Sequence, residues 1–355
     1  IHFIHIQNTL KPTMAAFKWD LGPGAGVGGI TLGATIQDVI QLLQKSPDAF
    51  PSIEIKFCAE DVLSMDILIE VPLIGLNIIF DSQEQRVRLI ELYKPQSVSV
   101  DYCGIACCGP KALPTLPSVY HQLGPTTPGQ YKDDEQAFWL VYPGVTFVFP
   151  IPRHYAHMFR PDSTAGAKDG CQLALLLPDG STPVASRIRV HPVGDSSLHC
   201  RPPPLPPSSP YFEPITAFST GALEFPARSC RLDFASTPQD VVGLLGSPSG
   251  TMRTPEAGMC GQYVFSYHEL GIDVLFDERR HCVCKFVLHS NNPGHADFGD
   301  YCKCNFRLRL QKPHGAACDS DVEAGTRASG QAHGQAAAAA ASGGAPAAAA
   351  AAAAA

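Results

Sequence analysis

The stretch GIDVLFDERRHCV, residues 271–283, contains the pattern that predicts the fold. Apolar residues alternate with others from Ile272 to Phe276, as expected of a strand that buries one face. Gly271 before this strand and Asp277 after it are typical turn residues. Strand-like runs also precede and follow it within residues 263–288. The stretch therefore predicts an antiparallel β-meander.

An earlier stretch repeats the pattern. Residues 75–81, GLNIIFD, have the spacing of residues 271–277. Gly75, Phe80 and Asp81 correspond to Gly271, Phe276 and Asp277. A repeated spacing of turn and core residues indicates a shared scaffold rather than shared catalysis.

A short amphipathic helix is predicted before each of these meanders. Thr237 suits an N-cap, and Asp240 lies three residues later, where its carboxylate accepts from free backbone N–H groups. Thr35 and Asp38 repeat this spacing. Gly246 follows the later helix, where a glycine commonly ends it.

A third, weaker copy surrounds Gly144 in residues 119–149. One amphipathic helix cannot bury a sheet face alone, so the units are expected to pack together. The predicted fold class is α+β, with repeated units of a short capped helix plus an antiparallel β-meander. The predicted segments are a non-native or flexible leader (1–29), unit one (30–100), unit two with irregular strands (101–200), a Pro-rich linker (201–224), unit three (225–310) and a disordered Ala- and Gly-rich tail (311–355).

Composition argues against several classes of protein. The formal net charge of −7 gives no electrostatic footprint for nucleic acid. No run of 18 apolar residues is present in the sequence, so no membrane span is expected. The 13 cysteines are scattered over strand-like segments, which favours reduced thiols in the cytosol over a secreted disulfide scaffold.

The start of the chain carries two expectations. Met14 would be a sensible first residue, so residues 1–13 are interpreted as upstream sequence. Gly24, Gly26 and Gly29 match a dinucleotide-binding G-x-G-x-x-G formally. A helix does not follow directly, so a flexible linker is the favoured interpretation.

Four cysteines could form a zinc site. Cys282 and Cys284 share a strand face, as do Cys302 and Cys304, and zinc takes four thiolates in a tetrahedron. Zinc knuckles use C-x2-C more often than C-x-C within strands. Small apolar strand residues are therefore the favoured interpretation.

Two polar sets have simpler explanations than chemistry. His289, His295 and Asp297 could form a loose metal set, but a polar turn after a strand explains them better. Asp277 and Glu278 pair two carboxylates at a hairpin tip, where turn formation is favoured over acid–base catalysis.

A thiol nucleophile is a further alternative. Cys103, Cys107 or Cys108 could pair with His121, although nothing in the sequence places the side chains together. No G-x-S-x-G, H-E-x-x-H or Walker motif is present in the sequence. The sequence thus predicts no catalytic residue, no cofactor and no metal.

The Pro-rich linker contains two short interaction motifs. Residues 201–207 fit the R-x-x-P-x-x-P pattern of an SH3 ligand, but a spacer is favoured. Residues 212–215, FEPI, have the aromatic-x-x-aliphatic form that ubiquitin-like autophagy modifiers accept as an added strand. That pattern is common, so it is a weak indication of binding.

The later meander resembles the phagophore assembly factor family, long grouped as an uncharacterised eukaryotic protein family. The resemblance covers residues 30–310 and is carried by residues 239–241, 245–248, 270–277, 285–289 and 291–295. The cysteines at 282, 284 and 302 stand where the family has basic residues or histidine. The Ala-rich tail stands where the family continues with another helix-and-strand segment, so a C-terminal truncation is expected.

The resemblance implies a role rather than an active site. Family members regulate autophagy at the phagophore assembly site with a WD-repeat β-propeller protein of the breast carcinoma amplified sequence type, to which phosphoinositide binding is attributed. A non-catalytic cytoplasmic adaptor is therefore expected, with indirect membrane contact and no nucleic-acid partner. The alternatives are a trafficking factor between the trans-Golgi and the plasma membrane, and a thiol or hydrolytic enzyme.

The positions of greatest interest are expected to be structural. They comprise turn glycines, core aromatic residues and turn or capping residues: Gly75, Phe80, Asp81, Gly144, Asp240, Gly246, Gly271, Phe276, Asp277, Pro293 and Gly294.

Overall fold

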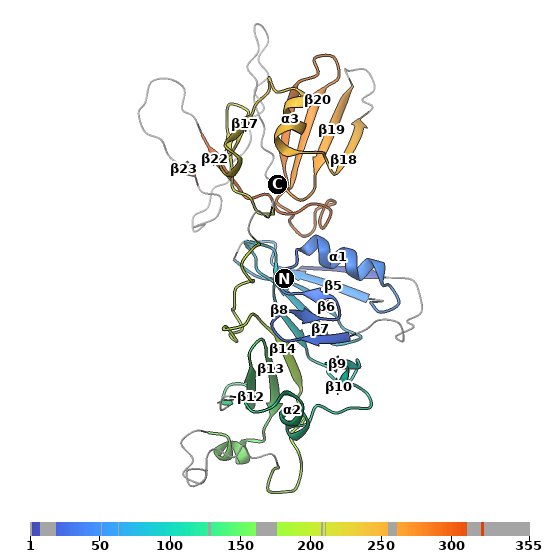
Figure 1. The fold of residues 1–355 in the computed structure, drawn as a ribbon, viewed down its shortest axis with the longest axis vertical. Coiled ribbons are helices and arrows are strands. Elements are labelled where there is room, and N and C mark those ends of the chain that lie inside the picture. Colours follow the sequence, from blue (N-terminus) through green and yellow to red (C-terminus); the bar gives the residue numbers. More distant parts are fainter. Residues whose placement is uncertain are drawn as a thin grey trace. The chain divides into compact units, whose positions relative to one another are not determined.

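The computed structural model describes residues 2–7, 19–50, 52–62, 64–126, 129–160, 176–206, 209, 211–254, 261–310 and 321–322. The chain divides into two compact units, Ile1–Leu205 and Pro206–Ala355 (Figure 1). No helix in these residue ranges is long and apolar enough to cross a membrane. Met14 and nearly all of the predicted tail lie outside the described residues.

The first unit is built on a nine-stranded antiparallel sheet in the order β1-β5-β6-β7-β8-β14-β13-β12-β11. The meanders predicted around Gly75 and Gly144 belong to this one sheet, because β8 pairs with β14. Its strands are β1 His2–Gln7, β5 Ser52–Phe57, β6 Ile67–Val71, β7 Leu76–Phe80, β8 Val87–Leu92, β11 Gln130–Lys132, β12 Ala137–Tyr142, β13 Val145–Pro150 and β14 Arg187–Val190.

Two helices accompany this sheet. Helix α1, Ile36–Lys45, begins with a capping box in which Thr35 Oγ1 accepts from the Asp38 backbone N–H and Asp38 Oδ2 accepts from the Thr35 N–H, each at 3.1 Å. Both bonds satisfy backbone donors that a helix start leaves free. Helix α2, Leu116–Leu123, has Thr115 as its N-cap. The apolar stripe of α1 is buried at Ile36, Val39, Ile40 and Leu43.

A second, five-stranded sheet corrects the prediction of a flexible leader. Its order is β10-β9-β2-β3-β4. The glycines at 22–29 permit close approach of backbones rather than flexibility: Gly24 N–H donates to Gly144 O at 2.9 Å, and a Cβ at Gly144 would lie 2.1 Å from Gly24 N. The strands are β2 Trp19–Gly22, β3 Gly26–Val27, β4 Ile30–Thr31, β9 Val100–Tyr102 and β10 Ile105–Cys108.

The second unit contains two sheets, in the orders β17-β16-β15-β22-β23 and β18-β19-β20-β21. One hydrophobic cluster joins both sheets to helix α3, Pro238–Leu245. The prediction of a linker at 201–224 is therefore wrong for its last part, which forms β15 and enters β16. The strands are β15 Ile215–Phe218, β16 Ala222–Phe225, β17 Cys230–Leu232, β18 Gly250–Thr254, β19 Gln262–Tyr267, β20 Ile272–Asp277, β21 Val283–Leu288, β22 Phe306–Arg309 and β23 Asp321–Val322.

Helix α3 is capped as the sequence pattern requires. Thr237 Oγ1 accepts from the Asp240 N–H at 3.3 Å, and Asp240 Oδ2 accepts from the Thr237 N–H at 2.8 Å. Gly246 follows the helix with a φ of 87°, in the region that favours glycine. The Tyr267 hydroxyl donates to Gly246 O at 3.0 Å and so fastens the helix end to β19.

The meanders at Gly75 and Gly271 have the same strand register when residues are counted from each glycine. Phe80 pairs with Ile67 as Phe276 pairs with Tyr263. A bulge lies immediately before each phenylalanine in its pairing with the next strand. Both phenylalanines are fully buried.

The turns that frame these meanders are also alike. Gly75 and Gly271 have φ angles of 70° and 68°. Asp81 Oδ1 accepts from two backbone N–H groups of its turn, at 3.0 and 2.7 Å, and Asp277 Oδ1 accepts two bonds of 2.8 Å in the same positions. Local turn chemistry therefore explains both aspartates.

The fold is mostly β-sheet, and the structure contains three α-helices within its described residues. The mixed α+β class holds in that coarse form. The division into three repeated units and the disordered tail remain predictions.

Candidate functional site

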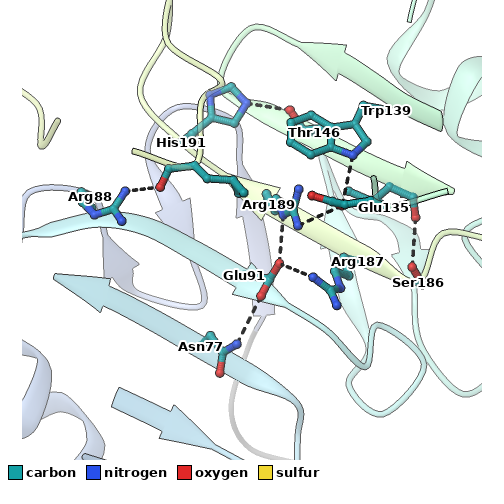
Figure 2. A network of polar contacts seen from close by, with 12 residues as sticks. Asn77, Arg88, Glu91, Glu135, Trp139, Thr146, Ser186, Arg187, Arg189 and His191 are labelled. Carbon is teal, nitrogen blue, oxygen red and sulfur yellow. Dashed lines mark hydrogen bonds and ion pairs between the residues drawn. The ribbon is translucent and has the colours of Figure 1, made fainter. Parts of the chain in front are cut away.

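The first unit contains a polar cluster centred on Arg189 of β14 (Figure 2). Arg189 is the cross-strand partner of Glu91, and its Nε donates to Glu91 Oε1 at 2.9 Å. Its Nη2 lies 3.5 Å from Glu135 Oε2, and the guanidinium carbon lies 4.7 Å from the centre of the Trp139 ring. Only 3% of the Arg189 side chain is exposed. Its buried guanidinium group is held both by packing on the indole ring and by ion pairs with carboxylates.

Two further residues extend this Arg189 cluster. Asn77 Nδ2 donates to Glu91 Oε2 at 3.2 Å, and Arg187 Nη1 lies 3.6 Å from Glu91 Oε1. Glu91 is thus surrounded by three donors. Asn77 Oδ1 and Arg189 Nη1 are buried without a hydrogen-bond partner in the described chain. The charged groups of the Arg189 cluster are therefore paired with one another, and two of its buried polar atoms lack a hydrogen-bond partner.

His191 lies beside this cluster as a buried neutral histidine. Its Nδ1 is 3.0 Å from Pro192 O, and its Nε2 is 2.9 Å from Thr146 Oγ1. A carbonyl oxygen only accepts, so Nδ1 carries the proton and the neutral Nε2 accepts from the Thr146 hydroxyl. Burial lowers the pKa of His191, which favours this neutral form.

Glu70 forms a smaller cluster on the meander of the first unit. Lys56 makes an ion pair with Glu70, and the Tyr93 hydroxyl donates to Glu70 Oε1 at 2.5 Å. Burial, with the Glu70 hydrogen bond, raises the pKa of Tyr93. Lys56 and Glu70 therefore stay ionised near neutral pH, and Tyr93 stays a neutral phenol.

The second unit contains a polar cluster centred on His289, which follows β21. His289 Nδ1 lies 2.6 Å from Asp297 Oδ2, and His289 Nε2 lies 3.1 Å from Asp273 Oδ2. The Tyr301 hydroxyl lies 2.8 Å from Asp273 Oδ1 and 3.1 Å from Ser266 Oγ. We call these five residues the His289 cluster.

The imidazole of His289 is covered on one face as well as paired at its edges. The Tyr301 ring stacks on it with centroids 3.7 Å apart and an interplanar angle of 9°. Burial acts to lower the pKa of His289, but hydrogen bonds and charge from Asp273 and Asp297 outweigh it and raise the pKa. Burial acts to raise the pKa of Asp273, but bonds from His289, Tyr301 and Ser266 outweigh it and lower the pKa.

The His289 cluster overlaps the metal set considered from the sequence. His289 and Asp297 are together, whereas His295 is exposed. Asp273 and Tyr301 were not predicted as members of this cluster, although the outward position of Asp273 in the alternating strand was a usable signal. No group of three or more His, Cys, Asp or Glu side chains could hold a metal ion in the part of the chain that the structure describes.

The cysteines considered as zinc ligands have local roles instead. Cys284 Sγ donates to Leu275 O at 3.4 Å, and Cys302 and Cys304 are buried. Burial raises the pKa values of the Cys284 and Cys304 thiols, which opposes the thiolate form that zinc requires.

Two of the cysteines considered as nucleophiles, Cys107 and Cys108, are held in the thiol form by burial. Burial raises the pKa of Cys107 to about 11 and that of Cys108 to about 12, while Cys103 is exposed. No hydrogen bond joins any of them to His121 within the described ranges. The described geometry thus offers no thiol and histidine pair at this place.

The motif at 212–215 is built into the second unit rather than free to bind. Glu213 is buried and its carboxylate oxygens lie 3.1 and 2.9 Å from Arg228 Nε. Ile215 is 2% exposed and pairs with Phe306 of β22. Offering this segment as an added strand would require β15 to leave its sheet. The SH3-type motif ends at Pro207, outside the described residues.

Comparisons with known proteins identify a family. The sequence model of the family described as phagosome assembly factor 1 (PHAF1) matches residues 26–329. A PHAF1 protein of Arabidopsis thaliana is 35% identical over 315 residues, covering 82% of this chain and 75% of the plant protein. A PHAF1 protein of Drosophila melanogaster is 28% identical over 344 residues, covering 85% and 75% of the two chains. No solved structure matches.

Proposed function

This chain belongs to the PHAF1 family, described as phagosome assembly factor 1, and from this premise we propose that it is a non-catalytic adaptor in autophagosome formation. The observation that carries the proposal is the family match over residues 26–329, which includes both structural units. A family described as an assembly factor brings other molecules together.

The polar clusters support an adaptor rather than an enzyme. Arg189 is paired with Glu91, and His289 is paired with Asp273 and Asp297. Acids and bases that satisfy one another in this way stabilise a scaffold, whereas a catalytic base must reach a substrate. The raised pKa values of the buried cysteines point in the same direction.

The proposed partner is a WD-repeat β-propeller protein at the phagophore assembly site. The chain would dock through sheet edges or an exposed apolar face and reach phosphoinositides only through the propeller. We place it in the cytoplasm. No feature of the described residues favours the trans-Golgi alternative over this role.

The proposal includes a scaffold made of repeated units. The common register and turn geometry at Gly75 and Gly271 support it. Such repetition supplies more than one sheet on a common backbone plan in one chain, which suits an adaptor.

The proposal is tested by affinity purification of the full chain from starved cells of its source, followed by mass spectrometry. Wild-type chain is expected to recover a WD-repeat propeller, with or without chelator. Met252 and Val193 are each 68% exposed and lie in different units, so Met252→Glu and Val193→Glu form a matched pair. Loss of the propeller in one variant would locate the docking face, and absence of a propeller from the wild-type preparation would overturn the proposal.

A further inference from the structure

The His289 cluster fastens a long connector to a sheet. Residues 290–305 join β21 to β22, which lies in the other sheet of the unit. Asp297 and Tyr301 belong to this connector and reach back to His289 and to Asp273 of β20. Side-chain bonds from the middle of the connector thus end on the outer face of the four-stranded sheet.

The geometry of the cluster favours a positively charged imidazole. Each ring nitrogen of His289 faces a carboxylate oxygen, at 2.6 Å for Asp297 and 3.1 Å for Asp273. Ionised carboxylates only accept hydrogen bonds, so both nitrogens must donate, which only the imidazolium can do. The stacked Tyr301 ring adds a favourable face for a cation.

Other titratable groups surround the cluster without hydrogen bonding to the ring of His289. The His268 ring meets the Tyr301 ring edge-on at 4.7 Å between centroids. The connector also carries His295, Asp300 and Lys303, which are exposed or half-buried. Asp273 and Asp297 therefore dominate the electrostatic environment of His289.

Backbone bonds hold the far end of the connector independently of this charge. Cys302 N–H donates to His268 O and Cys304 N–H donates to His289 O, each at 2.8 Å. Neither bond changes when an imidazole loses its proton. A change of charge at His289 should thus affect residues 291–301 and leave the anchored end in place.

We propose that His289 is a protonation-controlled clamp: its imidazolium fastens residues 291–301 to the sheet through Asp273 and Asp297, and loss of the proton releases them. A neutral imidazole can donate to only one of the two carboxylates and turns a lone pair toward the other. This inference concerns the second unit alone and does not rest on the adaptor role.

The direction of the pH dependence follows from the pKa of His289, which is raised above its ordinary value of 6.5. A raised folded-state pKa contributes stability that is fully present below pH 6.5 and is lost as the pH rises through the folded-state pKa. The connector is therefore held under mildly acidic conditions and loosened under alkaline conditions.

Hydrogen exchange on the full chain tests the clamp. With rates corrected for the intrinsic effect of pH, opening of residues 291–301 is expected to increase from pH 6 to pH 8.5, because the neutral imidazole can donate to only one of the two carboxylates. His289→Gln should remove this pH dependence. His281→Gln is the control, because His281 bonds Tyr263 rather than a carboxylate. Equal pH dependence in wild type and His289→Gln would overturn the proposal.

If His289→Gln fails to fold, an NMR titration of His289 in the wild-type chain tests the clamp directly. The NMR shift of the His289 ring in the wild-type chain is expected to change at a midpoint above pH 6.5. Asp297→Asn removes one carboxylate charge and should lower that midpoint. A wild-type midpoint at or below 6.5, or one that Asp297→Asn leaves unchanged, would contradict the clamp.

Discussion

The meander of the first unit and that of the second unit share their register but differ on their outer faces. The equivalent outward or flanking positions hold Glu70, Asn77 and Tyr93 in one meander, and Ser266, Asp273 and His289 in the other. In both meanders the flanking residue donates its backbone N–H to the framing glycine, at 2.7 Å for Tyr93 and 2.9 Å for His289. A shared backbone thus carries different chemistry.

This difference distinguishes the positions at which the fold restricts the residue type from those at which the residue type can vary. Gly75 and Gly271 need their positive φ angles, and Phe80 and Phe276 fill the core in both meanders. Residues on the outer faces of the two meanders need neither a positive φ angle nor a ring that fills the core. In the first unit Tyr93 stays neutral and Glu70 stays ionised near neutral pH, whereas in the second unit His289 can change charge.

The largest expected effect tests whether the two cores are equivalent. Phe80→Ala and Phe276→Ala should each cost about 3–5 kcal/mol of unfolding free energy in their own unit, because each removes a fully buried ring. Chemical denaturation followed by unit-specific hydrogen exchange measures both. Leu73→Ala is the control, since that side chain is 52% exposed. A large loss in one unit and none in the other would break the comparison.

The next effect tests the fixed charges of the first unit. Arg189→Ala should cost about 3–5 kcal/mol, because it leaves Glu91 buried without its main cation. Replacing both partners, as in Arg189→Met with Glu91→Leu, should recover much of that loss. Thermal unfolding of the single and double variants measures the recovery. A harmless Arg189→Ala would show that the Arg189 cluster does not stabilise the sheet.

A smaller effect is expected from substituting the glycines that precede the two central strands, Gly75 and Gly271. Gly75→Ala and Gly271→Ala should each cost about 1–3 kcal/mol, because both glycines have positive φ. The new Cβ at position 271 would lie 2.2 Å from Cys302 O, a backbone atom of the connector. At position 75 it would meet the Lys94 side chain at 2.4 Å. Only Gly271→Ala should therefore raise hydrogen exchange at residues 290–305.

The smallest effect concerns the neutral histidine of the first unit. The pKa of His191 is lowered by burial, so its stabilising contribution is full above pH 6.5 and falls as the pH drops below that value. Hydrogen exchange in β13 and β14 should rise on acidification, opposite to the connector of the second unit. Thr146→Val removes the hydroxyl donor and should raise exchange at neutral pH as well. Exchange that falls on acidification would contradict the neutral assignment.

Local patterns in the sequence predicted the strands of the meanders well. The strand predicted from Ile272 to Phe276 is β20, Ile272–Asp277, because alternation and turn residues act within a few positions. The Thr and Asp capping signals at the starts of α1 and α3 are local in the same way.

Contacts between distant residues could not be predicted in this way. The pairing of β8 with β14 joins residues about a hundred positions apart, and no local pattern encodes it. The ordered glycines near Gly24 depend on the distant turn at Gly144. The His289 cluster likewise combines a strand residue, Asp273, with a connector residue, Tyr301, so sequence spacing alone did not identify it.

One experiment compares both meanders in a single sample. Hydrogen exchange of the full chain from pH 6 to pH 8.5, corrected for intrinsic rates, reports residues 291–301 after His289 and residues 94–99 after Tyr93 together. We expect exchange to rise with pH in the segment after His289 and to stay constant in the segment after Tyr93. The same pH dependence of exchange in both segments would contradict the claim that the two meanders share a backbone but differ in their response to pH.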